Sequence, residues 1–77
     1  MVTSDGTVRR TMSARRFAMR LRSLRAAGGL TQETLARKVR VSRGYVSHLE
    51  LGRHDPPLSR VREIARALHV PVAELAE

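Results

Sequence analysis

The sequence contains no cysteine and no tryptophan, and it has only one phenylalanine and one tyrosine. Without cysteine the chain has no disulfide, no thiolate metal ligand and no cysteine nucleophile. Because aromatic side chains are so scarce, the core must consist of small aliphatic residues, chiefly Leu, Val, Ile and Ala. RNA-binding modules that stack bases on aromatic side chains are also disfavoured, since only Phe17 and Tyr45 are available.

Long apolar runs and acidic residues are also scarce. No apolar run approaches the ~20 residues that span a bilayer, and no apolar stretch follows the first arginines as a secretory signal would require. We therefore expect a cytoplasmic protein that has no membrane association. Seven Asp and Glu face 15 Lys and Arg in a chain of 77 residues, which gives a net charge of +8. So large a charge on a single small domain predicts an anionic partner, of which nucleic acid is the commonest.

The first 27 residues carry seven of the arginines and only one acidic residue, Asp5. Residues 1–12 mix small polar residues and arginine with no apolar periodicity, so we predict a flexible basic arm there. Arg9 and Arg10 of this arm are candidates for contacts with DNA phosphates, and a charged tail with no specific role is the alternative. Residues 13–77 form the predicted folded domain.

Apolar spacing predicts an all-α domain of five helices. The first helix begins near Ser13, shows an apolar face at Phe17, Leu21 and Leu24, and ends at the glycine pair that follows residue 27. Thr31 and Ser42 are N-cap candidates for the next two helices. The later helices are predicted over residues 32–39, 42–51, 58–69 and 71–76, the last with Pro71 in its first turn.

Two short helices joined by a turn of about three residues occupy residues 32–51. Ala36 supplies the small side chain that two steeply crossing helices need where they approach most closely. This is the helix-turn-helix arrangement. Characteristic motifs lie within and around it in a fixed order: Arg20-Leu21-Arg22-x-Leu24-Arg25, Gly29-Leu30-Thr31-Gln32-Glu33, Leu35-Ala36, Val41-Ser42-Arg43, Tyr45-Val46-Ser47, Leu49-Glu50-x-Gly52, Pro56-x-Leu58, Ile64-Ala65-x-Ala67-Leu68-x-Val70 and Glu74-Leu75.

These motifs, in this order over residues 17–75, resemble the Xre/Cro/cI group of bacterial and phage helix-turn-helix regulators. The resemblance implies a five-helix, lambda-repressor-like domain that binds double-stranded DNA and regulates transcription, most simply as a repressor. The helix at 42–51 would enter the major groove, and the chain would bind a two-fold operator as a homodimer. Dimer contacts would come from the last two helices around Val70, Val72 and Leu75, unless these residues only close the core.

Candidate base contacts are the exposed positions of the helix at 42–51. Arg43 lies at its N-terminal end, and arginine is the natural bidentate partner of guanine O6 and N7, although a phosphate contact is the alternative. Gly44 has no side chain, so it either allows close approach to the bases or leaves readout weak at that position. Ser47 lies one turn beyond Arg43, and His48 shares the outer face with Gly44.

Backbone contacts would position the domain without reading sequence. Gln32 is the best candidate, because it begins a helix beside positively polarised amides. Tyr45 lies at the edge of the implied interface, where a packing role is equally open. The remaining candidates are Thr31, Arg53, His54, Arg9 and Arg10.

Two further features of the resemblance concern the helix-turn-helix itself. The family often pairs an arginine of the first helix with the glutamate that ends the third, and this implies a structural ion pair between Arg25 and Glu50. Arg40 stands at a turn position that is usually glycine. A left-handed backbone there would cost on the order of 1 kcal/mol, and a slightly different turn is the alternative.

Other kinds of function find little support in the sequence. The spacings among His48, His54 and His69 do not suit a metal site, and we expect no metal and no cofactor. No phosphate-binding loop or nucleophile–base pattern indicates an enzyme. An antitoxin or another protein-interaction module of the same fold is the main alternative to a DNA-reading regulator. A non-specific cationic binder of RNA or membranes is a weaker one.

Overall fold

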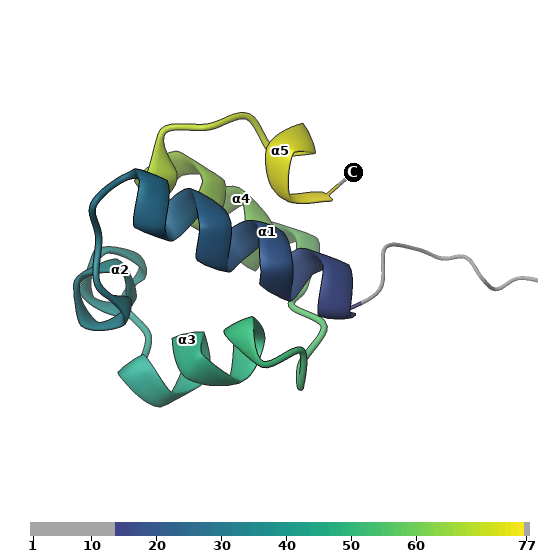
Figure 1. Cartoon of the computed structure of the whole chain (residues 1–77), viewed down its shortest axis with the longest axis horizontal. Coiled ribbons are helices and arrows are strands. Elements are labelled where there is room, and N and C mark those ends of the chain that lie inside the picture. The colour runs from purple at the N-terminus through teal and green to yellow at the C-terminus, as the bar shows by residue number, and fades with distance from the viewer. Residues whose placement is uncertain (1–13, 77) are drawn as a thin grey trace, which may run out of the picture.

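A computed structural model of the protein describes residues 14–76, which form five helices and no strand. The helices are α1 (Ala14–Ala27), α2 (Gln32–Val39), α3 (Arg43–Glu50), α4 (Leu58–Leu68) and α5 (Ala73–Ala76), as Figure 1 shows. The predicted all-α class and the five-helix order are confirmed. The predicted arm at 1–12, with Arg9 and Arg10, and the predicted N-cap Ser13 lie outside the described residues.

Helix α1 runs through the centre of the molecule and connects its two halves. It contacts α3 on one side and α5 on the other, while α4 contacts α2 and α5. In Figure 1, α4 passes behind α1, and α2 and α3 lie together at the left and lower edge of the molecule. The helix-turn-helix is therefore held on a scaffold built from α1, α4 and α5.

The core is small and almost entirely aliphatic, as the composition predicts. Its largest fully buried side chains come from every helix and are Phe17, Leu21, Leu35, Val46, Leu49, Ile64 and Leu75. Burying a side chain of this size stabilises the fold by roughly 1.5–3 kcal/mol relative to leaving it exposed.

The C-terminal segment closes this core. Leu75 has no exposed surface, and Val70 and Val72 pack against the core while partly buried. Leu75 therefore belongs to the core and contributes nothing to a dimer surface, because a fully buried side chain has no area left for a partner, whereas Val70 and Val72 keep some exposed surface. The large exposed apolar side chains among residues 14–76 are instead Met19, Leu51 and Leu58.

Both helices of the helix-turn-helix begin at their predicted caps. The Thr31 hydroxyl accepts a hydrogen bond from the Thr34 amide at 3.0 Å, and the Ser42 hydroxyl accepts one from the Tyr45 amide at 3.0 Å. Each bond satisfies one of the amides that a first helical turn leaves without a partner. Arg40 ends α2 in the left-handed conformation, with φ 62° and ψ 45°. The turn therefore keeps the geometry that usually calls for glycine.

The end of the chain departs slightly from the prediction. Pro71 precedes α5 instead of forming its first turn. Its carbonyl accepts a turn hydrogen bond from the Glu74 amide at 3.0 Å, and the first i→i+4 hydrogen bond runs from the Ala76 amide to the Val72 carbonyl at 2.9 Å. Helix α4 ends at Leu68, one residue early, since His69 turns left-handed at φ 59°. None of the helices in residues 14–76 combines the length and apolar character needed to cross a membrane.

Candidate nucleic-acid interface

The outer side of α3 forms a continuous polar face. Arg43, Gly44 and His48 are exposed, and Ser47 is half-buried. Residues four apart lie on one side of a helix, so Arg43 stands above Ser47 and Gly44 stands above His48. The opposite side of α3 is anchored by the buried Val46 and Leu49. The structure therefore brings all four predicted base-contact residues together on one surface.

Arg43 is the first residue of α3, where it follows the Ser42 cap. Within residues 14–76 the three ion pairs are Arg25–Glu50, Arg37–Glu33 and Arg60–Glu63, so Arg43 takes part in none of them. Its guanidinium is exposed and is free to bind an external partner.

Gly44 needs neither an unusual backbone conformation nor extra space inside the protein. A Cβ atom built at this position would meet only the Ser42 Oγ atom, at 3.8 Å, which is an ordinary van der Waals contact. Glycine destabilises a helix relative to alanine, so folding alone does not explain its presence.

A cluster of rings joins α3 to the loop at 51–57 and to α4. His48 Nδ1 lies 3.4 Å from His54 Nε2, and the His54 ring stacks on Tyr45 with centroids 6.0 Å apart. The Arg60 guanidinium lies 5.7 Å from the centre of the Tyr45 ring. This cluster, and the part that Arg60 plays in it, could not be predicted from the sequence, because contacts between three separate elements leave no periodic signal.

The His48–His54 contact brings two possible metal ligands together, but no third joins them. Among residues 14–76, no group of three or more His, Cys, Asp or Glu side chains is placed to hold a metal ion. His69 lies apart, at the end of α4. The arrangement suits two exposed hydrogen-bonding groups better than a metal site.

Glu50 is the buried polar centre of the helix-turn-helix. Its two carboxylate oxygens accept hydrogen bonds from Arg25 Nε at 2.5 Å and Arg25 Nη2 at 3.0 Å. Gln32 Nε2 donates to Glu50 Oε1 at 3.0 Å. Arg25 also donates to the Leu30 carbonyl at 2.8 Å, and Arg22 donates to the Glu50 carbonyl at 3.4 Å. One carboxylate therefore fixes α1, the start of α2 and the end of α3 relative to one another.

The ion pair implied by the resemblance is thus present, but the role of Gln32 is larger than expected. One N–H of its amide is committed to Glu50, and an amide group has a second N–H. Gln32 is only half-buried, so this second donor remains available for an external acceptor such as a phosphate. Of the other backbone candidates within residues 14–76, Tyr45 is half-buried, and Thr31, Arg53 and His54 are exposed.

The surroundings of Glu50 perturb its ionisation. Burial raises the pKa of its carboxyl, but the hydrogen bonds from Arg25 and Gln32, together with the charges of Arg25 and Arg22, outweigh burial and leave the pKa below its ordinary value of 4.5. The hydrogen bond that Arg25 donates to Glu50 raises the pKa of Arg25 against the opposing effect of burial. The pair is therefore fully ionised at neutral pH.

This lowered pKa predicts how stability depends on pH. A carboxyl whose pKa is lower in the folded state stabilises the fold fully above its unfolded pKa and loses that contribution as the pH falls through the folded value. We expect the free energy of unfolding, measured with urea, to fall as the pH drops below ~4.5. Glu50→Gln should show a shallower fall over the same range, and equal pH slopes for the two proteins would contradict this role of Glu50.

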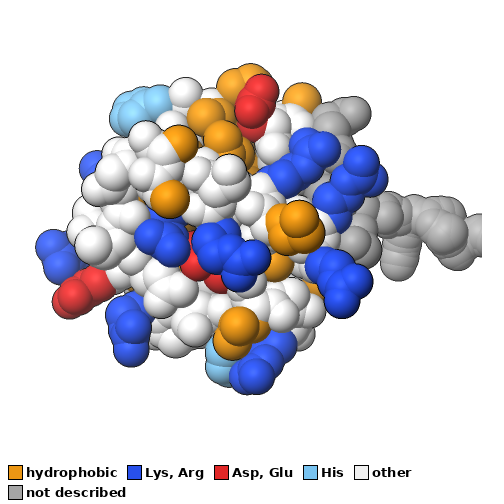
Figure 2. All heavy atoms as spheres, in the orientation of Figure 1, with side chains coloured by type: hydrophobic (Ala, Val, Ile, Leu, Met, Phe, Trp, Pro, Cys, Tyr) orange, Lys and Arg blue, Asp and Glu red, His pale blue; other side chains and the backbone are white. Residues whose placement is uncertain are grey.

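The charge of the surrounding surface matches the polar face of α3. Figure 2 shows Lys and Arg side chains spread over the face that α1 crosses, with few acidic side chains between them. Exposed arginines lie along α1 and in the segment after α3, and they include Arg15, Arg16, Arg22 and Arg53. A surface of this kind attracts a polyanion from a distance.

Comparison with known proteins agrees with this geometry. Residues 16–77 match the family model of the helix-turn-helix domain. An HTH-type transcriptional regulator of Archaeoglobus fulgidus is 41% identical over 56 residues, which cover 73% of this chain and 80% of the relative. The immunity repressor protein of Bacillus phage phi105 is 36% identical over 56 residues, but these cover only 39% of the phage protein.

Solved structures give the same result. The restriction-modification controller protein C.AhdI from Aeromonas hydrophila superposes with a TM-score of 0.78 at 40% identity, covering 80% of this chain and 94% of that one. The clp gene regulator ClgR from Corynebacterium glutamicum gives a TM-score of 0.80 at 35% identity, with coverage of 84% and 69%. The family predicted from the sequence is confirmed: the chain belongs to the helix-turn-helix family of transcriptional regulators, which bind DNA and are not enzymes.

Proposed function

We propose that this protein is a cytoplasmic repressor that reads duplex DNA with α3 in the major groove and binds a two-fold operator as a homodimer. The observation that carries this proposal is the exposed face of α3, where Arg43 forms no ion pair within residues 14–76. The hydrogen bonds of Glu50 to Arg25 and Gln32 fix the end of this helix against α1 and α2. Rigid presentation of a helix face with an unengaged arginine suits direct readout of a guanine.

The remaining candidate residues fall into two roles around this face. Ser47 and His48 lie beside Arg43 and Gly44 and would contact base edges. Thr31, Gln32, Tyr45, Arg53, His54 and, from the arm, Arg9 and Arg10 would contact the sugar-phosphate backbone. The exposed Met19, Leu51 and Leu58 provide apolar surface for a contact between the two copies.

Selection of binding sites from a random duplex DNA pool tests the function most directly. Salt of ~150 mM suppresses binding that depends only on charge. We expect an enriched inverted repeat whose half-sites lie about one helical turn apart, as two copies of α3 would require. A pool without any enriched motif would contradict sequence-specific binding and favour a module whose main partner is a protein.

Gly44→Ala should separate folding from DNA binding. Alanine fits the helix and meets no obstacle, so the free energy of unfolding should rise by up to ~1 kcal/mol. Affinity for the selected operator should fall, because the new methyl group stands on the face that approaches the bases. Urea denaturation and fluorescence anisotropy measure the two effects. A more stable protein with unchanged operator affinity would show that close approach at Gly44 is not needed.

A further inference from the structure

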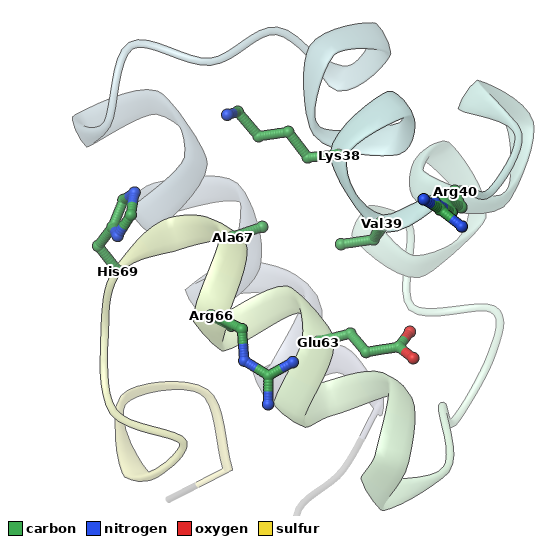
Figure 3. A pocket seen from close by; sticks show the side chains of 7 residues that line it. All are labelled: Lys38, Val39, Arg40, Glu63, Arg66, Ala67 and His69. Atoms are coloured by element: carbon green, nitrogen blue, oxygen red, sulfur yellow. The ribbon is translucent and has the colours of Figure 1, made fainter.

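A second charged feature lies at the other end of the helix-turn-helix. A pocket of about 400 Å³ opens between the last turn of α2 and the second half of α4. Figure 3 shows Lys38 and Arg40 at the end of α2, and Arg66 and His69 at the end of α4, around this opening. Val39 and Ala67 supply its apolar part.

The positive charge of this pocket is not neutralised inside the described chain. Its one acidic residue, Glu63, is engaged by Arg60, whose Nη1 lies 2.7 Å from Glu63 Oε1. Lys38, Arg40 and Arg66 take part in none of the ion pairs within residues 14–76, and all three are exposed. The pocket therefore presents three Lys and Arg side chains and a histidine to solvent.

Two of the basic residues at the rim of this pocket have a left-handed backbone conformation. Among residues 14–76 four have a positive φ, of which Gly29 and Gly52 are glycines and tolerate it. The other two are Arg40 and His69, and both line this one pocket. A non-glycine residue in the left-handed region costs stability, and such strained positions cluster at functional sites. Glycine would suit folding better at both positions, so the basic side chains point to a ligand.

The pocket is separate from the face proposed to read DNA. Helix α2 carries Gln32 at its first residue and Lys38 near its last, so the two surfaces lie at opposite ends of this helix. No residue of α3 lines the pocket. A ligand bound there would therefore be separate from the bases that α3 is proposed to read, whichever DNA sequence that is.

The geometry points to a docking site for an acidic segment of a partner protein. Long Lys and Arg side chains around the rim match carboxylates spread along a peptide, and Val39 and Ala67 suit the aliphatic parts of such a segment. A single compact phosphate fits less well, because the Lys38, Arg66 and His69 side chains are spread around the rim and do not converge on one point (Figure 3). We therefore assign carboxylate side chains to this site.

Backbone amide shifts of the ¹⁵N-labelled full chain test this assignment. The probe is an end-blocked decapeptide of alternating Glu and Ala, and its Gln–Ala counterpart is the neutral match. We expect saturable shifts confined to residues 38–40 and 63–69 with the acidic peptide only. Shifts that centre on Arg43–Glu50 would overturn the proposal. So would inorganic phosphate that shifts the same amides with higher affinity than the peptide.

Two double variants with equal charge changes provide the control. Lys38→Gln with Arg66→Gln should weaken peptide binding about tenfold or more, since two charged contacts are lost. Arg37→Gln with Arg62→Gln removes two cations from the same helices but outside the pocket and should stay within about twofold. If both double variants weaken peptide binding equally, the peptide is held by the general positive charge of the surface and not by this pocket, which would overturn the proposal. A selective loss of operator affinity in the first pair would place the pocket in the DNA interface and overturn the proposal.

A third variant uses the strained backbone. Arg40→Gly with His69→Gly should raise the melting temperature, because glycine relieves both left-handed positions, and should still weaken peptide binding. Retained peptide affinity in this more stable protein would show that the two rim side chains bind nothing.

Discussion

Replacing Arg25 with methionine is expected to lower the free energy of unfolding by ~3–5 kcal/mol, because it removes one partner of a buried pair. The Glu50 side chain is only 4% exposed, and two of its three side-chain hydrogen bonds come from Arg25. Without Arg25 the carboxylate stays buried with Gln32 as its only side-chain donor among the described residues. Urea denaturation at neutral pH, where Glu50 is ionised, measures the loss.

The exposed pair between Arg37 and Glu33 is the matched control. Its atoms lie 3.6 Å apart and its side chains are 72% and 71% exposed, so Arg37→Met should change stability by no more than ~1 kcal/mol. Adding Glu50→Gln to Arg25→Met should restore part of the loss, because the buried charge disappears while Gln32 keeps an acceptor. If Arg25→Met and Arg37→Met cost the same, the Glu50 network does not hold the helices together.

This network also explains why a stability defect would reach function. Glu50 is the last residue of α3, and its partners come from α1 and from the first residue of α2. Loss of the network frees the angle between the two helices of the helix-turn-helix even where the hydrophobic core survives. We therefore expect the Arg25→Met protein that remains folded to bind the operator more weakly.

Much of the fold follows from local signals in the sequence. The apolar spacing of Phe17 and Leu21 predicted the buried face of α1, and the short polar side chains of Thr31 and Ser42 predicted the starts of α2 and α3. These features work because hydrophobic periodicity and N-capping act within a few residues of the chain. The pairing of Arg25 with Glu50 has no such local signal, and it was expected only from the family resemblance.

Contacts between distant elements could not be predicted in the same way. The hydrogen bond from Gln32 to Glu50 spans 18 residues, and the ring cluster of His48, His54 and Tyr45 depends on how the loop at 51–57 folds back. Leu75 looks equally suited to a dimer surface or to a core until its burial is known. In each case the same side chain can either pack inside the protein or face a partner, and only the tertiary packing determines which.

Arg43→Ala gives the sharpest test of base reading. Arg43 is exposed and forms no ion pair within residues 14–76, so its removal should leave the free energy of unfolding almost unchanged. If its guanidinium binds a guanine, operator affinity should fall by ~1–3 kcal/mol and base preference should relax at one position of each half-site. Repeating the site selection with the variant measures both effects.

Arg53→Ala provides the comparison for a backbone contact. Arg53 is exposed in the segment after α3, where a phosphate contact is proposed. Its loss should weaken binding about equally for all DNA sequences, while base preference stays intact. The slope of log K against log salt concentration should become shallower by about 1, as expected for one lost phosphate contact. If Arg43→Ala behaves in this same way, Arg43 contacts a phosphate, and sequence reading must come from Ser47, His48 and the backbone around Gly44.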